Sequence, residues 1–188
     1  MPPSKYPTLA DGTLVADTNA AMGFPHIPGR PSPEKLVHPL LDYELGTHFS
    51  YHDQSGFLTR TPTIKQVLPL LVVKVDADGN EVAGVKSPLQ MAPLGTYTGW
   101  NVMSSGVFKG QMCQFTSPVG GFIPFAETKV DRLASGDPRP SLEERYHTHD
   151  GYVRAVTAAA GTLVEDGFLR RADADAMIRQ AEASDILR

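Results

Sequence analysis

Cysteine is nearly absent from this sequence, since Cys113 is the only one among 188 residues. A single cysteine excludes an internal disulfide and a zinc site built from thiolates of one chain. Cys113 stands in QMCQF, an alternation of apolar and polar residues that is typical of a strand. We therefore expect a small packed residue here rather than a functional thiol.

Basic charge is also scarce. Lysine and arginine together number 17 against 21 aspartates and glutamates, which gives a net charge of -4, and the pI is about 5.8. The longest basic run is the pair Arg170 and Arg171. A nucleic-acid-binding surface normally shows as a basic patch or stripe, so we expect no nucleic-acid partner.

Long hydrophobic runs are missing as well. No apolar stretch reaches the length of a transmembrane helix, so the sequence predicts no membrane association. The first residues, MPPSKYPTLADG, have no hydrophobic core of the kind found in signal peptides. We therefore expect a cytoplasmic protein by default.

Several motifs of known chemistry do not occur. No serine has a glycine two residues before it, so the G-x-S-x-G turn that presents the nucleophile of α/β-hydrolases is absent. Neither GxxxxGK[ST] nor GxGxxG occurs, which excludes the common phosphate-binding loops. We expect no cofactor.

Proline, in contrast, is plentiful, and nine of the 16 prolines come before Val67. Residues 1–66 are therefore predicted to form an irregular wrap. Residues 67–137 carry β-branched runs and Gly-rich turns, which predict a small antiparallel sheet between Val67 and Phe122. Residues 138–188 have helical periodicity. The predicted fold class is α+β, with these three regions forming one structural domain and the last one a helical hairpin.

A hairpin turn is predicted at Asp78-Gly79, because glycine adopts the positive φ that tight turns between strands need. The polar residues Asp76, Asp78 and Asn80 also suggest a calcium loop. However, the twelfth position of such a loop requires glutamate, and Ser87 stands there. The hairpin is the better interpretation.

The helical region has clear start and stop signals. Ser141 and Glu144 have the spacing of a capping box, in which each side chain binds the other's free backbone N–H. Apolar residues between Tyr152 and Val164 share one helical face, and Gly167 ends the helix. A second helix is predicted from about Ala172 to Ser184.

The string YHTHDGY, residues 146–152, is similar to the metal motif HxHxDH, but its aspartate comes one residue too early. We interpret it as a loop between helices, with Thr148 or Asp150 as N-cap. His48 and His52 have the i, i+4 spacing of half a HExxH site, yet the glutamate is missing. They are weak metal candidates, and hydrogen-bonded loop histidines are the preferred interpretation.

Several strings resemble, in their order along the chain, the C-terminal part of a bacterial family of alpha/beta hydrolase domain-containing proteins, which are uncharacterised and esterase-like. The strings are PPSKYPTLADGTLV, GFPHIPG, VDADGNEVAGV, PLGTYTGWN, GGFIPFAETKVDRLASGDPRPSLEERY and GYVRAVTAAAGTLVEDGFL. The resemblance covers Pro2 to about Ala183, and PLGTYTGWN and DPRPSLEERY are its more specific parts. It implies that the core carrying the nucleophile and the histidine lies upstream of the matching part, so no catalytic residue is carried over.

The stretch MAPLGTYTGWN, residues 91–101, holds the only tryptophan. Tyr97 and Trp100 supply large apolar surface with a polar tip, and with Asn101 they are our candidate binding residues. We expect them to pack or dock against a hydrolase core. The alternative is that they line a substrate pocket that such a core completes.

These observations leave three functional hypotheses. In the first, the chain is a non-catalytic C-terminal segment of an esterase-like hydrolase, inactive alone, and either the partner of a separately encoded core or a truncated remnant. It predicts an exposed apolar patch. In the second, the chain is a self-sufficient oligomeric binding module of unknown ligand, which covers that patch by self-association. In the third, it is a metal-dependent enzyme using His48, His52, His147 or His149.

Overall fold

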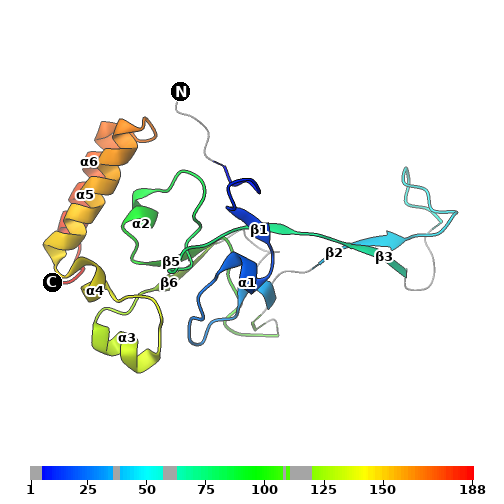
Figure 1. Ribbon diagram of the computed structural model, residues 1–188, viewed down its shortest axis with the longest axis horizontal. Helices are drawn as coiled ribbons and strands as arrows, with labels where there is room; N and C mark the ends of the chain where they lie inside the picture. The colour runs from blue at the N-terminus through cyan, green and yellow to red at the C-terminus, as the bar shows by residue number, and fades with distance from the viewer. Residues whose placement is uncertain (1–5, 36–38, 57–62, 108, 111–119) are drawn as a thin grey trace.

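The computed structural model describes residues 6–35, 39–56, 63–107, 109–110 and 120–188 (Figure 1). The strands are β1 Leu14–Ala16, β2 Leu40–Glu44, β3 Thr63–Leu68, β4 Leu71–Val73, β5 Gly95–Thr98 and β6 Gly121–Pro124. The helices are α1 Asn19–Met22, α2 Pro88–Met91, α3 Lys129–Ser135, α4 Leu142–Tyr146, α5 His149–Glu165 and α6 Arg171–Ala183, with a 3-10 turn at Pro33–Lys35. The predicted α+β class is confirmed. Cys113, expected on a strand, lies outside the described residues.

The strands form three separate antiparallel pairs within the described part of the chain, namely β1 with β4, β2 with β3, and β5 with β6. The predicted location of the sheet, between Val67 and Phe122, was therefore too narrow. Strands β1, β2 and most of β3 lie in the segment 1–66, which was predicted to be irregular. The signal is weak there because β1 has three residues and β2 and β3 are mostly exposed, so neither shows the alternation of a half-buried strand.

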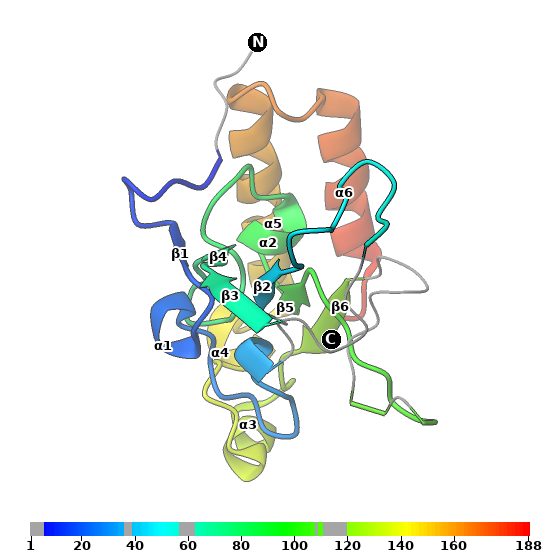
Figure 2. The same cartoon turned by 90° about the vertical axis from the view of Figure 1, so that its right-hand side faces the viewer.

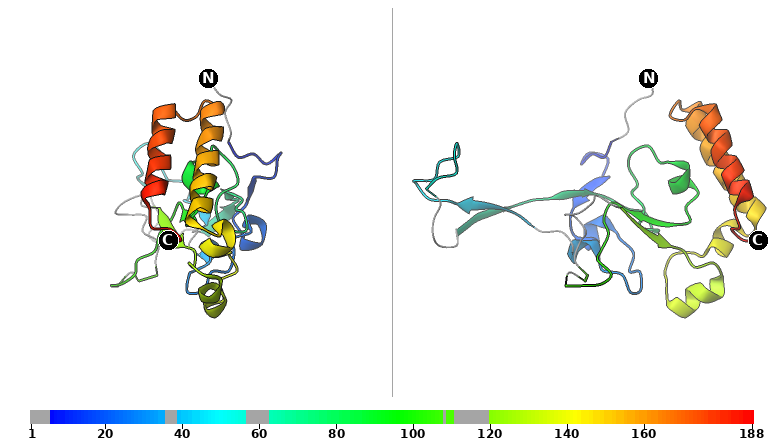
Figure 3. Two further views of the ribbon diagram at one scale, coloured as in Figure 1. Left: turned by 90° about the vertical axis from the view of Figure 1, so that its left-hand side faces the viewer. Right: turned by 180° about the vertical axis from the view of Figure 1, so that it is seen from behind.

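Strands β2 and β3 form an arm that projects from the rest of the molecule (Figures 1 and 3). The pairing slips between Asp42 and Tyr43, so Lys65 has no partner opposite it and forms a β-bulge. At the root of the arm, only Pro69 and Leu70 separate β3 from β4, which pairs with β1 in the body. We call the pair of strands β2 and β3 the arm.

The predicted turn at Asp78-Gly79 is present. The backbone N–H of Asp76 donates to the carbonyl of Asn80 at 2.8 Å, and Gly79 has a φ of 80°. The Asp76 carboxylate accepts bonds from the N–H groups of Asp78 and Asn80, both at 3.0 Å. Asp78 in turn binds the guanidinium of Arg145. The polar side chains of the turn thus build and anchor it, in agreement with the hairpin interpretation.

The helical hairpin is present with nearly the predicted bounds, and α5 and α6 lie side by side (Figure 2). Thr148 is the N-cap of α5, where its hydroxyl accepts from the N–H of Gly151 at 3.1 Å. The chain leaves α5 through Gly167, at a φ of 78°. A link between helices is present as expected, but it is shorter than the string 146–152, because only His147 and Thr148 separate α4 from α5 and residues 149–152 form the first turn of α5.

The core consists of two small clusters. One joins the helices to the loop before β5 and comprises Ala92, Phe125, Leu142, Tyr146, Tyr152, Val156 and Ala181. The other lies beneath α1 and the hairpin turn and comprises Met22, Phe24, Ile27, Val75 and Ile123, with Val72 and Trp100 packed against it. Among the described helices, none combines the length and the hydropathy needed to cross a membrane.

Candidate functional site

Arg139 binds four other residues from the centre of the body, and its side chain is 1% exposed. Its Nε and Nη2 donate to the carboxylate of Asp137 at 3.0 and 2.6 Å. Its Nη1 donates to Thr96 Oγ1 at 2.8 Å and to the carbonyl of Ile123 at 3.0 Å, and Nη2 also reaches the carbonyl of Pro124 at 3.2 Å. All five N–H groups of the guanidinium therefore have an acceptor within the chain, so Arg139 has none left for a ligand.

The acid that neutralises Arg139 is held in its ionised form. Burial raises the pKa of Asp137, but the hydrogen bonds and the positive charge of Arg139 lower it by more, so the net pKa lies below the ordinary value. A buried ion pair of this kind is tolerated because the remaining donors and acceptors are satisfied. We call Arg139, Asp137 and Thr96 the clamp.

The clamp continues into the hairpin turn through Asn80, which is fully buried. The amide nitrogen of Asn80 donates to the carbonyl of Gly95 at 3.2 Å, and its oxygen accepts from the N–H of Tyr97 at 2.7 Å. The Thr96 hydroxyl donates to the carbonyl of Asp78 while it accepts from Arg139. Strand β5 is thus held by hydrogen bonds from both the turn and the clamp, which meet at the Thr96 hydroxyl.

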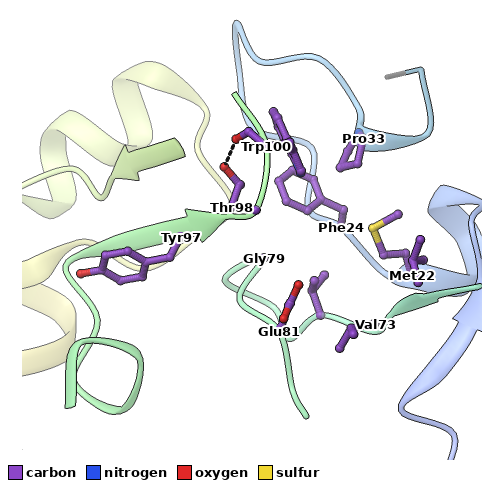
Figure 4. A pocket seen from close by; sticks show the side chains of 12 residues that line it. Met22, Phe24, Pro33, Val73, Gly79, Glu81, Tyr97, Thr98 and Trp100 are labelled. Atoms are coloured by element: carbon purple, nitrogen blue, oxygen red, sulfur yellow. Dashed lines mark hydrogen bonds between the residues drawn. The ribbon is translucent and has the colours of Figure 1, made fainter. Parts of the chain in front are cut away.

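Beside β5 lies an open hollow of about 210 Å³ with mostly apolar walls (Figure 4). Its lining comes from α1 and the loop after it, β4, the hairpin turn and the end of β5, and comprises Met22, Phe24, Pro33, Val72, Val73, Val75, Gly79, Glu81, Tyr97, Thr98, Gly99 and Trp100. The rings of Phe24 and Trp100 pack against each other, with centroids 5.9 Å apart and a tilt of 55°. Glu81 carries the one ionisable carboxylate of this lining. The hollow suits an apolar group.

The structure brings two of the three candidate binding residues to this hollow. Trp100 forms part of its wall with Phe24, whereas the Tyr97 ring points away from both of them and packs on Phe122, with ring centroids 5.1 Å apart. Burial raises the pKa of the Tyr97 hydroxyl. Asn101 is exposed, is not part of the lining, and accepts a bond from the N–H of Val102 at 2.8 Å. A binding role for these residues remains a prediction.

Within the described residues, none of the hydrogen bonds joins a serine hydroxyl to a histidine ring. Ser141 and Glu144 form the predicted capping box, with Ser141 Oγ 3.2 Å from the Glu144 N–H. The Ser55 hydroxyl donates to Asp53 at 2.7 Å. His149 uses both ring nitrogens on backbone carbonyls of the C-terminal segment, at 2.9 and 3.2 Å. A serine nucleophile activated by a histidine is therefore not found in this part of the chain.

The four histidines considered for a metal site do not converge on one. His48 and His52 are exposed and lie in turns rather than on one face of a helix. His147 ends α4 with a φ of 63°, and His149 is engaged by the backbone. No group of three or more histidine, cysteine, aspartate or glutamate side chains in the described ranges is placed to hold a metal ion.

Reasoning from the sequence missed the partners of Trp100 and Thr96. Phe24 lies in GFPHIPG and Arg139 in DPRPSLEERY, two of the strings on which the resemblance was based. Arginine between two prolines reads as an exposed loop residue, and nothing local indicates that it is buried.

In a comparison with known families, the profile of a family described as "Alpha/beta hydrolase domain" matches residues 10–179, a range that includes the clamp and the hollow. Searches of curated proteins and of solved structures give no match.

Proposed function

Because this chain belongs to the alpha/beta hydrolase domain family, we propose that it is a non-catalytic, C-terminal segment of an esterase-like hydrolase. On its own it is inactive, and it supplies one wall of the site of a catalytic core that these 188 residues do not contain. The observation that carries this proposal is the open hollow at Phe24 and Trp100, which lies beside a rigid clamp and has no activated nucleophile near it among the described residues.

The size of the hollow supports a site shared with another chain. Its volume of about 210 Å³ is below the roughly 300–1,000 Å³ of ordinary small-molecule sites. A second wall laid over the hollow would enlarge it and exclude water from it. Trp100 and Phe24 would then contact either an apolar acyl chain or an apolar side chain of the core.

The sequence also supports a non-catalytic role for this segment. Ester hydrolysis by this class of enzyme needs a nucleophile that a general base activates, and an oxyanion hole. The 188 residues contain no G-x-S-x-G turn. The buried side chains of Arg139 and Asn80 are occupied by Thr96 and by the backbone. They hold β5 in place.

An ester-hydrolysis assay tests this proposal. We expect the purified chain to hydrolyse chromogenic short-chain esters no faster than their background rate of hydrolysis in buffer. We expect activity only when the chain is produced together with a hydrolase that carries the G-x-S-x-G turn, with Trp100→Ala lowering it and the exposed control Tyr6→Ala leaving it unchanged. Robust turnover by the chain alone, abolished by a serine-directed inhibitor, would overturn the proposal.

The second hypothesis, a self-sufficient oligomeric binding module, is favoured by a different observation. The arm leaves several large apolar side chains in solvent, among them Tyr43, Ile64 and Val67. In this alternative the chain needs no catalytic core, and a single cooperative melt of the purified protein would support it.

A further inference from the structure

The chain exposes far more surface than a compact protein of its mass. Its accessible surface is 12381 Å², whereas a folded monomer of 20.3 kDa exposes about 8,800 Å². The difference is about 3,600 Å². A dimer interface of standard size removes about 800 Å² from each partner, so the excess is several times what one such interface needs.

Strands β2 and β3 of the arm expose five large apolar side chains, and three of them, Tyr43, Ile64 and Val67, lie on one of its faces. Residues paired directly across two strands point to the same side, and neighbours along a strand alternate. The pairs Leu41 with Val67 and Tyr43 with Ile64 therefore share a face, because the bulge absorbs the intervening residue of β3. Ile64 and Val67 are 50% and 61% exposed. We call these four residues the apolar face of the arm.

The opposite face carries the charges of the arm, together with the exposed pair Leu40 and Leu68 at the end next to Pro69. Asp42 pairs with Gln66 and Glu44 with Thr63 on that side, and Lys65 lies 3.8 Å from the Asp42 carboxylate. Two apolar faces can therefore meet without bringing like charges together, although each chain carries a net charge of -4. Like charges repel and so oppose self-association of an acidic protein, but the charged side chains of the arm lie outside this contact.

The edges of the arm are less suited to binding than its face. A β-bulge and charged side chains are the usual means by which proteins protect an unpaired strand edge, and here Lys65 supplies both on β3, while Asp42 and Glu44 supply charge on β2. An isolated two-stranded ribbon is only marginally stable in water and needs packing on a face. A partner that stabilises the ribbon is therefore expected to pack on its apolar face.

We propose that the apolar face of the arm is the dimerisation surface of this protein, and that it packs against the same face of a second copy. Identical patches that meet across a two-fold axis form a closed dimer and leave no free patch to recruit further copies. The two ribbons then form two layers, as packed sheets do, at a separation of about 10 Å. The contact leaves the hollow at Trp100 free and does not depend on whether a catalytic core binds there.

The mass of the purified full chain in solution, measured by light scattering across about a hundredfold range of concentration, tests the proposal. We expect twice the mass of 20.3 kDa at the upper end and dissociation at the lower end. Ile64→Lys and Val67→Lys are expected to raise the dimer dissociation constant at least about tenfold, because each brings a charge onto the apolar face. Thr63→Lys and Gln66→Lys, equally exposed on the other face of β3, are the matched controls and keep the dimer.

Circular dichroism of each variant shows whether the helical hairpin has stayed folded, so a loss of dimer is not mistaken for unfolding. Three results overturn the proposal. The first is a monomer at every concentration, including one that forms a complex only with a catalytic core. The second is a dimer that survives both substitutions on the apolar face. The third is a dimer that the control substitutions weaken to the same degree.

Discussion

Arg139 Nη1 lies 2.8 Å from Thr96 Oγ1, and this bond joins two segments that are 43 residues apart in the sequence. The two segments are DPRPSLEERY and PLGTYTGWN, both of which lie within the part of the chain that the hydrolase family profile matches. Each supplies half of a buried polar network, and a buried polar network is stable only when every member has its partner.

Removing the positive charge from the clamp is expected to be severe. Arg139→Met keeps much of the side chain's bulk but leaves Asp137 as a buried, unpaired carboxylate, so we expect a loss of about 3–5 kcal/mol in the free energy of unfolding. Arg170→Met is the control, because the Arg170 side chain is 88% exposed and its pair with Asp173 is worth less than about 1 kcal/mol. Urea denaturation of both variants measures the difference. Equal losses would contradict the assigned role of the clamp.

Two glycines in β5 and the loop after it are expected to respond differently to alanine. A Cβ at Gly95 would lie 2.4 Å from the carbonyl oxygen of Ile123, which is far closer than atoms approach, whereas a Cβ at Gly99 meets nothing within 4 Å. We expect Gly95→Ala to lower the free energy of unfolding by about 1–3 kcal/mol or more. Gly99→Ala should change it by less than about 0.5 kcal/mol. Thermal melts compare the two, and a tolerated Gly95→Ala would mean that β5 and β6 are not packed as closely as described.

Glu144 is expected to make the stability of the fold depend on pH in the acidic range. Hydrogen bonds from Arg132 and from the Ser141 N–H lower the pKa of Glu144 from its ordinary 4.5 to about 2. Because the folded-state pKa is depressed, the stabilisation is complete above pH 4.5 and is lost as the pH falls toward 2. Glu144→Gln lacks this contribution, so its melting temperature should be lower at neutral pH and should fall less in that window. The exposed Glu165→Gln should follow the unchanged protein, and parallel profiles for Glu144→Gln would contradict the prediction.

The single tryptophan allows the hollow to be monitored directly. Trp100 packs on Phe24, so Phe24→Ala is expected to expose the indole to water and shift its emission to longer wavelength. Phe122→Ala is the control, because that ring packs on Tyr97 instead. Steady-state fluorescence records both. An unchanged emission maximum in Phe24→Ala would show that Phe24 does not shield Trp100.

The helical part of the fold was predictable because its signals are local. The capping box at Ser141 and Glu144, the N-cap at Thr148 and the stop at Gly167 are all defined by residues within a few positions of one another. The turn at Gly79 follows the same rule. Such elements depend little on the rest of the protein, and the sequence shows them directly.

The strands before Val67 and the clamp were not predictable, because long-range contacts determine both. Strand β1 exists because β4, more than 50 residues later, pairs with it. Arg139 is buried because acceptors from β5 and β6 surround it, and its own neighbours in the sequence are prolines. The hollow was foreseen only in part, since Trp100 was identified from its residue type but Phe24 was not.

The short link between the arm and the body places the apolar face of the arm next to the hollow in the chain. Only Pro69 and Leu70 lie between β3, which carries half of the apolar face, and β4, whose Val72 and Val73 line the hollow. A partner bound to the arm would therefore be only two residues along the chain from the β4 wall of the hollow. A dimer formed through the arms would therefore carry two hollows, one at the root of each packed ribbon.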